Sequence, residues 1–218
     1  MPASKQYLID DLSMQESWRL FKILSEIVDG FETLNDIGPA VSVFGSARVG
    51  PEEAWYKKTE ELSRLLVEGG FTVITGGGPG LMEAGNKGAF EAGGSSVGLH
   101  IHLPLEQKNN QFLTTRCDFR YFFVRKLMFI KYAMAYIAMP GGFGTLDELS
   151  EALVLIQTKR IKKFPIVLMG KDFWAGLVDW FKARLVTDGY CNPKDLDLFL
   201  VTDSCEEAVE HIRRHVII

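Results

Sequence analysis

Apolar residues change their spacing along the chain, and this spacing predicts where helices and strands lie. Between residues 13 and 36 they recur every three or four positions, which is the period of an amphipathic helix. The residues on this stripe are Trp18, Leu20, Phe21, Leu24, Ile27, Val28 and Phe31. We expect this N-terminal helix to end before Gly38 and Pro39 and to pack against the domain or against a partner.

From residue 40 onward, short runs of consecutive apolar residues alternate with segments of helical period. We predict strands at 40–45, 71–75, 96–103, 118–123, 135–139, 165–169 and 198–201. Helices are predicted up to residues 68 and 92, and from residues 124, 145, 172 and 204. Uninterrupted apolar strands between helices are typical of a parallel sheet with helices on both faces. The pattern therefore predicts an α/β fold with a doubly wound parallel sheet.

Length and composition suit one globular domain. The chain has 218 residues, of which 47% are hydrophobic, and this is enough for one well-filled core. We therefore expect residues 1–218 to form a single domain. A net charge of −4 offers no basic surface for nucleic acid or for an anionic membrane, and we expect neither as a partner.

The cysteines and the N-terminal residues bear on the compartment. Cys117, Cys191 and Cys205 are odd in number and lack CxxC spacing, which argues against a disulfide framework and a thiolate zinc site. The first residues contain no apolar leader, and no apolar run approaches the roughly 20 residues of a membrane span. The sequence therefore favours a soluble, unprocessed protein of the cytoplasm.

Residues able to bind phosphate follow four of the predicted strands. Carboxyl ends of parallel strands share one edge of the sheet, and ligands bind at that edge where the strand order reverses. The residues concerned are Gly45 to Arg48, Gly76 to Gly80, Arg125 with Lys126, and Gly141 to Thr145. We expect them to form one site, with Ser46, Arg48 and Lys126 among the substrate-binding residues. The irregular segment from Pro104 to Arg116 is a candidate mobile cover for this site.

The segment from Pro140 to Glu148, with sequence PGGFGTLDE, is the most informative motif. It lies between a predicted strand and a predicted helix, so it indicates a glycine turn that leads into a helix N-terminus. Free N–H groups and the helix dipole make such a turn a binding site for an anion, and a phosphate-bearing ligand is the natural choice. Glu148 would then lie close to the rest of that ligand. Alternatively, Thr145 and Glu148 form a capping box with no role in binding.

Other functional patterns find less support. The glycines at 76–80 do not have GxGxxG spacing, and no GxxxxGK[ST] loop is present, which disfavours NAD and P-loop ATP hydrolysis. Ser46 lacks a GxSxG elbow, and no third ligand completes a metal site with His100 and His102. Glu83 either holds ribose hydroxyls or compensates a helix dipole. Arg125 and Lys126 begin a helix, where a cation needs a partner such as a phosphate or Glu148. A surface salt bridge is the alternative for both basic residues.

Three segments together resemble the LOG family, the cytokinin riboside 5′-monophosphate phosphoribohydrolases that were long labelled lysine decarboxylases. They are the glycine segment from Gly76 to Ala89, the pair Arg125-Lys126, and the segment from Pro140 to Glu148. The likeness extends from about residue 41 to 186. It implies a Rossmann-like homodimer, or an assembly of dimers, that hydrolyses a nucleoside 5′-monophosphate to free base and ribose 5-phosphate. The resemblance also implies that no metal or organic cofactor is needed.

The same resemblance assigns roles to individual residues. It places the catalytic pair at Arg125 and Glu148. The substrate-binding glycine turns fall on Gly77, Gly78, Gly141, Gly142, Gly144 and Thr145. The segment GGGPGLMEA matches a longer branch of the family, because the plant cytokinin-activating branch has glycine in place of Glu83. This difference favours AMP or a related purine nucleotide over a cytokinin nucleotide.

Loss of a base from ribose passes through an oxocarbenium-like transition state that requires nearby negative charge and a placed water. We expect Glu148 to supply both and Arg125 to keep its carboxylate ionised. No residue stands out as the acid for the leaving base. Two other functions stay open. One is a nucleotide-binding or sensing module without turnover, and the other is a decarboxylase that forms a Schiff base between pyridoxal phosphate and Lys126.

Overall fold

One parallel sheet forms the centre of the computed structural model, which describes residues 16–102, 110–162 and 164–216. Within these ranges seven strands pair in the order β4-β3-β2-β1-β5-β6-β7, and every neighbouring pair is parallel. The strands are β1 Ala40–Phe44, β2 Thr72–Thr75, β3 Ser96–Ile101, β4 Thr115–Phe119, β5 Ala133–Ala138, β6 Ile166–Met169 and β7 Phe199–Thr202. The predicted parallel sheet is confirmed.

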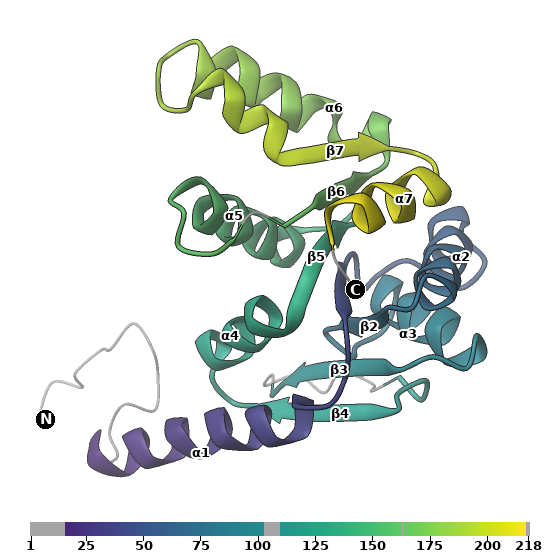
Figure 1. Cartoon of the computed structure of the whole chain (residues 1–218), viewed down its shortest axis with the longest axis vertical. Helices are drawn as coiled ribbons and strands as arrows, with labels where there is room; N and C mark the ends of the chain where they lie inside the picture. Colours follow the sequence, from purple (N-terminus) through teal and green to yellow (C-terminus); the bar gives the residue numbers. More distant parts are fainter. Residues whose placement is uncertain (1–15, 103–109, 163, 217–218) are drawn as a thin grey trace, which may run out of the picture.

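Helices cover both faces of this sheet, as Figure 1 shows. One face packs against α1 Glu16–Leu34, α4 Phe122–Tyr132, α5 Phe143–Gln157 and α6 Lys171–Trp180. The other face packs against α2 Ala54–Glu68, α3 Leu81–Glu91 and α7 Cys205–His215. Each face has its own hydrophobic cluster. The doubly wound, Rossmann-like architecture predicted from the alternation of strands and helices is thereby confirmed.

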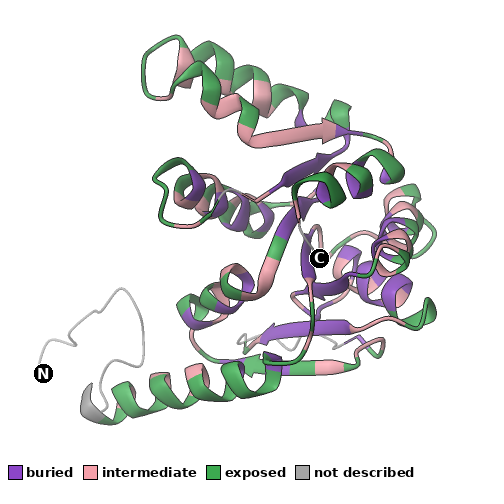
Figure 2. Cartoon of the chain, in the orientation of Figure 1, coloured by how far each residue is buried: buried purple, intermediate pink, exposed green. Residues whose placement is uncertain are grey.

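The strands in the middle of the sheet are the most buried part of the molecule (Figure 2). All residues of β1, β2 and β6 are buried, because helices cover both of their faces. Phe44 of β1 lies between Phe129 and Tyr136, with its ring centroid 4.9 Å from each of theirs. Full burial of a large apolar side chain stabilises the folded state by about 1.5–3 kcal/mol, so these strands anchor the fold.

The strand order reverses at β1, and this determines where a ligand can bind. The chain runs from β1 outward to β2, β3 and β4, then crosses back to β5 on the other side of β1. The connections after β1 and β5 therefore diverge to opposite faces and leave a crevice at the carboxyl ends of these two strands.

The fourth strand was placed too late by the sequence. We predicted it at 118–123, but β4 covers Thr115–Phe119 and α4 already begins at Phe122. The carboxylate of Glu26 accepts the N–H groups of Arg120 and Tyr121, at 3.0 and 3.3 Å, and this contact ends the strand. Because β4 lies at the sheet edge, its exposed and buried residues alternate, so it lacks the continuous apolar run of a central strand.

The remaining boundaries agree with the predictions to within a few residues. α6 continues into a π-helical segment, Phe181–Val186, and a 3₁₀ segment, Pro193–Leu198, precedes β7. Ser204 caps α7, and its hydroxyl accepts the N–H of Glu207 at 3.0 Å. Part of the predicted cover, residues 103–109, lies outside the described residues. In the described ranges, no helix is long and apolar enough to cross a membrane.

Candidate active site at the carboxyl edge of the sheet

Three glycine-containing turns meet at the carboxyl edge of the sheet. The N–H of Ser46, after β1, donates to the carbonyl of Pro140, after β5, at 3.0 Å. The carbonyl of Ser46 accepts the N–H of Leu81, at the start of α3, at 2.9 Å. Gly80 has φ +72°, and a Cβ on it would overlap the Ser46 carbonyl, so only glycine allows the turns to approach this closely. The predicted meeting of strand ends is confirmed for these three turns.

The turn after β5 leads directly into α5. The helix begins at Phe143 with Gly142 as its N-cap, and no side chain caps it. Leu146 donates to the carbonyl of Gly142 at 3.1 Å, so the N–H groups of the first three helical residues have no partner within α5. An anion could accept hydrogen bonds from them.

The capping-box alternative is wrong. α5 begins three residues earlier than a capping box at Thr145 requires, so Thr145 is the third helical residue rather than the N-cap. Both Thr145 and Glu148 are buried, and the Thr145 hydroxyl occupies the space that a Cβ on Gly141 would need. The Thr145 side chain is therefore packed against the glycine turn, and neither side chain caps the helix.

Glu148 lies in a cluster of charges between α4 and α5. Its side chain is 5% exposed, and its carboxylate is 3.5 Å from the ammonium of Lys126. Lys126 also pairs with Asp147 at 3.0 Å and with Glu151 at 2.8 Å. Burial raises the pKa of Glu148, and the charges of Lys126 and then Arg125 only partly oppose that rise. The result is a carboxylate of raised pKa on the helix whose first N–H groups have no partner within it.

The expected contact between Arg125 and Glu148 is replaced by one to Lys126. Among the described residues, the Arg125 guanidinium and the Glu148 carboxylate form no ion pair within 4 Å. The charge of Arg125 nevertheless lowers the pKa of that carboxyl group. One residue apart on α4, the two cations face different surroundings, and Lys126 forms the ion pair. The sequence could not decide between them, since both follow the same strand.

Arg125 instead lies between aromatic rings and the turn after β2. Its guanidinium is 5.3 Å from the ring centroid of Phe122 and 5.7 Å from that of Phe129. One of its terminal nitrogens is 3.8 Å from the place where a Cβ on Gly76 would lie. Its Nε is buried and has no hydrogen-bond partner among the described residues, and burial lowers the pKa of the side chain. A buried donor without a partner is costly, so an acceptor on a ligand would stabilise it.

The side chains of Thr75 and His100 contact the turn after β2. Gly77 has φ +69° and donates its N–H to the hydroxyl of Thr75 at 2.9 Å. The imidazole of His100 fills the space that a side chain on Gly77 would take. Burial, and then the charge of Arg116, lower the pKa of His100. Sequence reasoning considered His100 only as a metal ligand and missed this packing role.

Three further candidates lie on or near the same turns. The hydroxyl of Ser46 accepts the N–H of Arg48 at 3.1 Å, so it stabilises the turn after β1, while the Arg48 side chain is exposed. Glu83, in the first turn of α3, accepts a hydrogen bond from the hydroxyl of Tyr56 at 2.9 Å. Tyr56 was not predicted, because a tyrosine on a distant helix carries no signal in the sequence.

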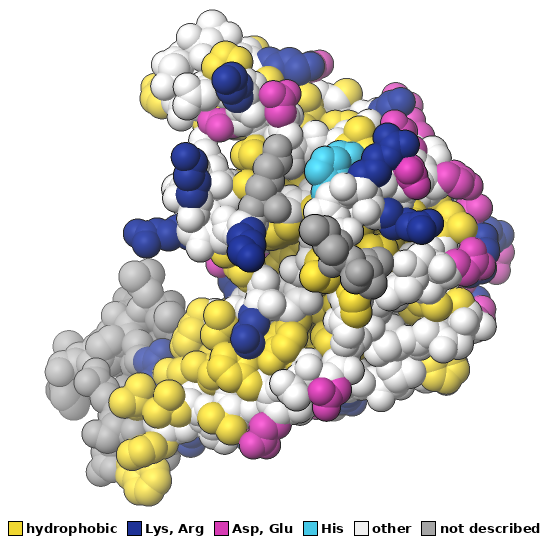
Figure 3. All heavy atoms as spheres, viewed as in Figure 1, with side chains coloured by type: hydrophobic (Ala, Val, Ile, Leu, Met, Phe, Trp, Pro, Cys, Tyr) yellow, Lys and Arg dark blue, Asp and Glu magenta, His cyan; other side chains and the backbone are white. Residues whose placement is uncertain are grey.

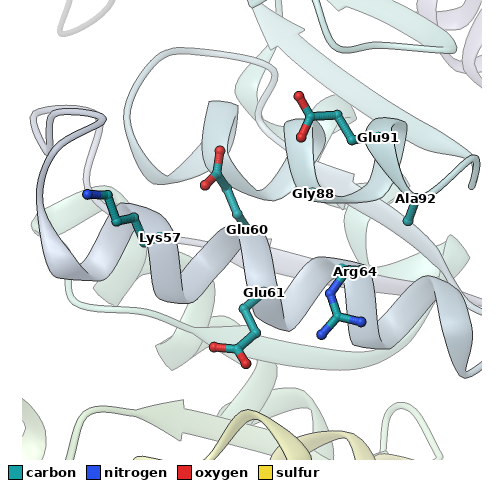
Figure 4. Close-up of a pocket in the computed structure, with 7 residues that line it drawn as sticks. All are labelled: Lys57, Glu60, Glu61, Arg64, Gly88, Glu91 and Ala92. Carbon is teal, nitrogen blue, oxygen red and sulfur yellow. The ribbon is translucent and has the colours of Figure 1, made fainter.

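Two hollows in the structure contain none of the predicted site residues. One, of about 290 Å³, lies between α2 and α3 and is shown in Figure 4. It is lined by charges of both signs, and Glu60 pairs with Lys87 at 2.5 Å. The other, of about 190 Å³, is mainly apolar and lies beside α5 and the segment 181–199. Among the described residues, no group of three or more His, Cys, Asp or Glu is arranged to hold a metal ion.

Comparison with known proteins supports the resemblance seen in the sequence. A family model described as possible lysine decarboxylase matches residues 82–212, which is more than half of the chain. The chain is 25% identical over 177 residues to the cytokinin riboside 5′-monophosphate phosphoribohydrolase LOG5 of Arabidopsis thaliana, covering 80% of this chain and 77% of that protein. It is 29% identical over 171 residues to a probable cytokinin riboside 5′-monophosphate phosphoribohydrolase, LOG4, of Oryza sativa subsp. japonica, covering 77% and 73%.

Solved structures share the fold. The crystal structure of the protein TM1055 superposes with a TM-score of 0.61 at 26% identity, covering 81% of this chain and 99% of that one. The molybdenum cofactor binding protein of Rippkaea orientalis gives the same TM-score at 21% identity, covering 81% and 96%. At that identity the second likeness concerns the fold alone.

Proposed function

The chain belongs to the family described as possible lysine decarboxylase, and we propose that it is a nucleoside 5′-monophosphate phosphoribohydrolase. In this reaction water attacks the anomeric carbon of the ribose, the N-glycosidic bond breaks, and free base and ribose 5-phosphate are released. The observation that supports it most is the position of Glu148, a buried carboxylate on the same helix whose N-terminus offers free N–H groups.

The N-terminus of α5 is the proposed phosphate site. Gly141, Gly142 and Gly144 carry no side chain that would shield the N–H groups, and the helix dipole favours an anion. A phosphate bound here would place the attached ribose within one to two helical turns of Glu148. Binding energy from this group, which does not react, would then orient the sugar for the chemical step.

Glu148 and Arg125 are the proposed catalytic residues. The carboxylate of Glu148 would stabilise the positive charge that develops on the ribose, and it would accept a proton from the attacking water. Its raised pKa makes it a better base than an exposed glutamate. The Nε of Arg125, which lacks an acceptor in the described structure, would donate to an oxygen of the bound nucleotide.

The relatives and the residue at position 83 bear on which base the substrate carries. The Arabidopsis and rice relatives are named for cytokinin riboside 5′-monophosphates. The sequence resemblance implies that Glu83 takes the place of a glycine of the plant branch. The hydrogen bond with Tyr56 fixes the Glu83 carboxylate in the first turn of α3. We therefore propose AMP or a related purine nucleotide as the substrate, with a cytokinin nucleotide as the alternative.

The family description would suggest a decarboxylase that uses pyridoxal phosphate, and Lys126 does not fit that cofactor. A Schiff-base lysine must lose its proton readily. Burial lowers the pKa of Lys126, but hydrogen bonds to Glu151 and Asp147, together with the charges of Glu148 and Glu151, outweigh that effect and leave the pKa raised. The ammonium is held by three carboxylates, so its nitrogen has no lone pair to offer a carbonyl group.

The direct test is to incubate the purified protein with AMP and to separate the products chromatographically. We expect equal amounts of adenine and ribose 5-phosphate. Adenosine, which lacks the phosphate, should be a poor substrate in the same assay, and a panel of nucleoside monophosphates would give the base preference. Tight binding of AMP without release of adenine would instead identify a nucleotide-binding module, and equal turnover of adenosine and AMP would remove the argument for a phosphate site.

A further inference from the structure

Four polar side chains are buried beneath the turn that follows β2. Thr75, Asn86 and Ser96 are fully buried, and Asn110 is 6% exposed. The carboxamide of Asn86 lies at the centre. It donates to the hydroxyl of Ser96 at 2.9 Å and accepts from the hydroxyl of Thr75 and, at 3.0 Å, from the carboxamide of Asn110. A buried network with satisfied hydrogen bonds is rigid and fixes one geometry.

Asn110 connects this network to the glycine turn. Its backbone N–H donates to the carbonyl of Gly77 at 3.3 Å, and its carboxamide nitrogen donates to the carbonyl of Gly78 at 3.2 Å. Its carboxamide oxygen accepts the N–H of Phe112 at 3.1 Å. Asn110 therefore uses both ends of its side chain, and two consecutive carbonyls of the turn point towards it.

The direction of these carbonyls determines the direction of the next N–H group. In a trans peptide the C=O and N–H bonds of one unit point in opposite directions. Since the Gly77 carbonyl points to Asn110, the N–H of Gly78, in the same peptide unit, points away from Asn110. The positive φ of Gly77, +69°, permits this orientation. In the described residues the Gly78 N–H has no backbone acceptor.

We infer that Asn110 is a positioning residue, which holds the turn so that the Gly78 N–H faces the ribose phosphate of the substrate. Its backbone N–H holds the Gly77 carbonyl, and its side-chain bonds to Asn86, Phe112 and the Gly78 carbonyl keep that N–H in place. The inference rests on the proposed function, and it explains why a buried carboxamide occurs at a place where an apolar side chain would fill the same space. Arg125, whose guanidinium lies beside Gly76, would bind the same part of the substrate.

The test compares two variants that lose hydrogen bonds in the same segment. Asn110→Ala removes the three side-chain bonds that hold residue 110 in place, to the Gly78 carbonyl, Asn86 and Phe112. Thr114→Val removes two bonds to Ser96, of 2.9 and 3.0 Å, and touches no residue of the turn. Affinities for AMP and for ribose 5-phosphate are measured by calorimetry, and thermal unfolding is followed for each protein. We expect Asn110→Ala to weaken both affinities about tenfold, as loss of one aligned hydrogen bond would. Thr114→Val should change them less than twofold, although both variants lose stability.

Kinetics separate positioning from general destabilisation. If the Gly78 N–H contacts the bound nucleotide before and during reaction alike, Asn110→Ala raises KM and leaves kcat nearly unchanged. Should this variant fail to fold, Asn110→Leu keeps a side chain of similar size, removes the same three bonds without adding a buried charge, and carries the same expectation. Wild-type affinities in the variants, or equal losses in Thr114→Val, would overturn the inference.

The wild type is assayed first, so that the two proposals can fail separately. Absence of base release from every nucleotide would reject the proposed hydrolase, while the affinities would still decide the role of Asn110. A wild type that neither binds nor cleaves nucleotides would reject both.

Discussion

Single charged residues determine what the site can do, and their surroundings differ sharply over short distances. The Lys126 side chain is 17% exposed and pairs with three carboxylates, while the neighbouring Arg125 has a buried Nε without an acceptor. Glu148 loses hydration on burial, and this effect exceeds the attraction of both cations, so its pKa is raised. Such a carboxyl group is ionised mainly above its raised pKa, and the nearby cations keep that pKa from rising further.

We predict that Lys126→Met moves the acidic limb of the pH–activity profile to higher pH. Without the ammonium, the pKa of Glu148 rises further, so a smaller fraction of it is ionised at any given acidic pH. Activity that depends on the ionised form is then lost earlier as the pH falls. The measurement is kcat/KM for AMP across the pH range. Lys57→Met is a matched control, because Lys57 is exposed and, within the described part of the chain, its ion pair is with Glu52, at 3.5 Å, on the surface.

An unchanged acidic limb in Lys126→Met would show that Lys126 does not influence the reactive carboxyl group. A similar shift in Lys57→Met would point to the net charge of the protein rather than to the ion pair with Glu148.

At the scale of elements, the sequence predicted what depends on local pattern and missed what depends on contacts. Continuous apolar runs identified the central strands, and the glycine motifs identified the turns at their carboxyl ends. β4 was misplaced because Glu26, distant in sequence, ends it. The ion pair of Glu148 was assigned to Arg125 because the rotation of α4 relative to α5 is not encoded in either motif. Asn110 lies in a polar run of the sequence, and that run does not indicate that its side chain bonds to Gly78 and Asn86.

Backbone conformation and packing predict opposite effects on stability for two glycine substitutions, one in the turn after β2 and one in α6. Gly77→Ala should destabilise the fold by about 1–3 kcal/mol, because its φ is +69° and the ring of His100 occupies the space of the new Cβ. Gly176→Ala, in α6, should stabilise it by about 0.5–1 kcal/mol, because a Cβ there meets nothing within 4 Å and alanine favours the helix. Urea unfolding of both variants measures the difference, and equal changes would contradict this account of the turn.

On the scale of the whole molecule, one side of the structure exposes more apolar surface than a monomer needs. Figure 3 shows hydrophobic side chains gathered over the region of α1 and α4. The exposed large residues of these two helices are Trp18, Leu20, Phe21, Leu24, Val28, Phe31, Phe122, Phe123 and Leu127. The opposite side of α1 packs on α4: Gly30 is buried there, and a Cβ on it would overlap Met128 of α4. Contiguous apolar surface of this kind marks an interface.

We predict that the protein is a homodimer through the α1 and α4 surface, and that the active sites depend on it because Arg125 lies on α4. Light scattering at micromolar concentration should give twice the mass of the chain. The double substitution Phe21→Asp with Leu24→Asp should shift the protein to the monomer, because two buried charges per copy would disfavour association. Tyr190→Asp, at a residue 76% exposed outside this surface, serves as control. A fully active monomeric wild type would contradict the prediction and leave core packing as the reason for α1.

The central claim is that Glu148 performs the chemistry while the glycine turns hold the nucleotide. The most direct measurement compares the wild type with Glu148→Gln for adenine release from AMP and, in parallel, for AMP affinity. Glutamine preserves the size of the side chain, so the phosphate site and the fold should persist. The account predicts that base release is abolished while affinity stays within a few-fold of the wild type. Release of adenine by Glu148→Gln at the wild-type rate would contradict it.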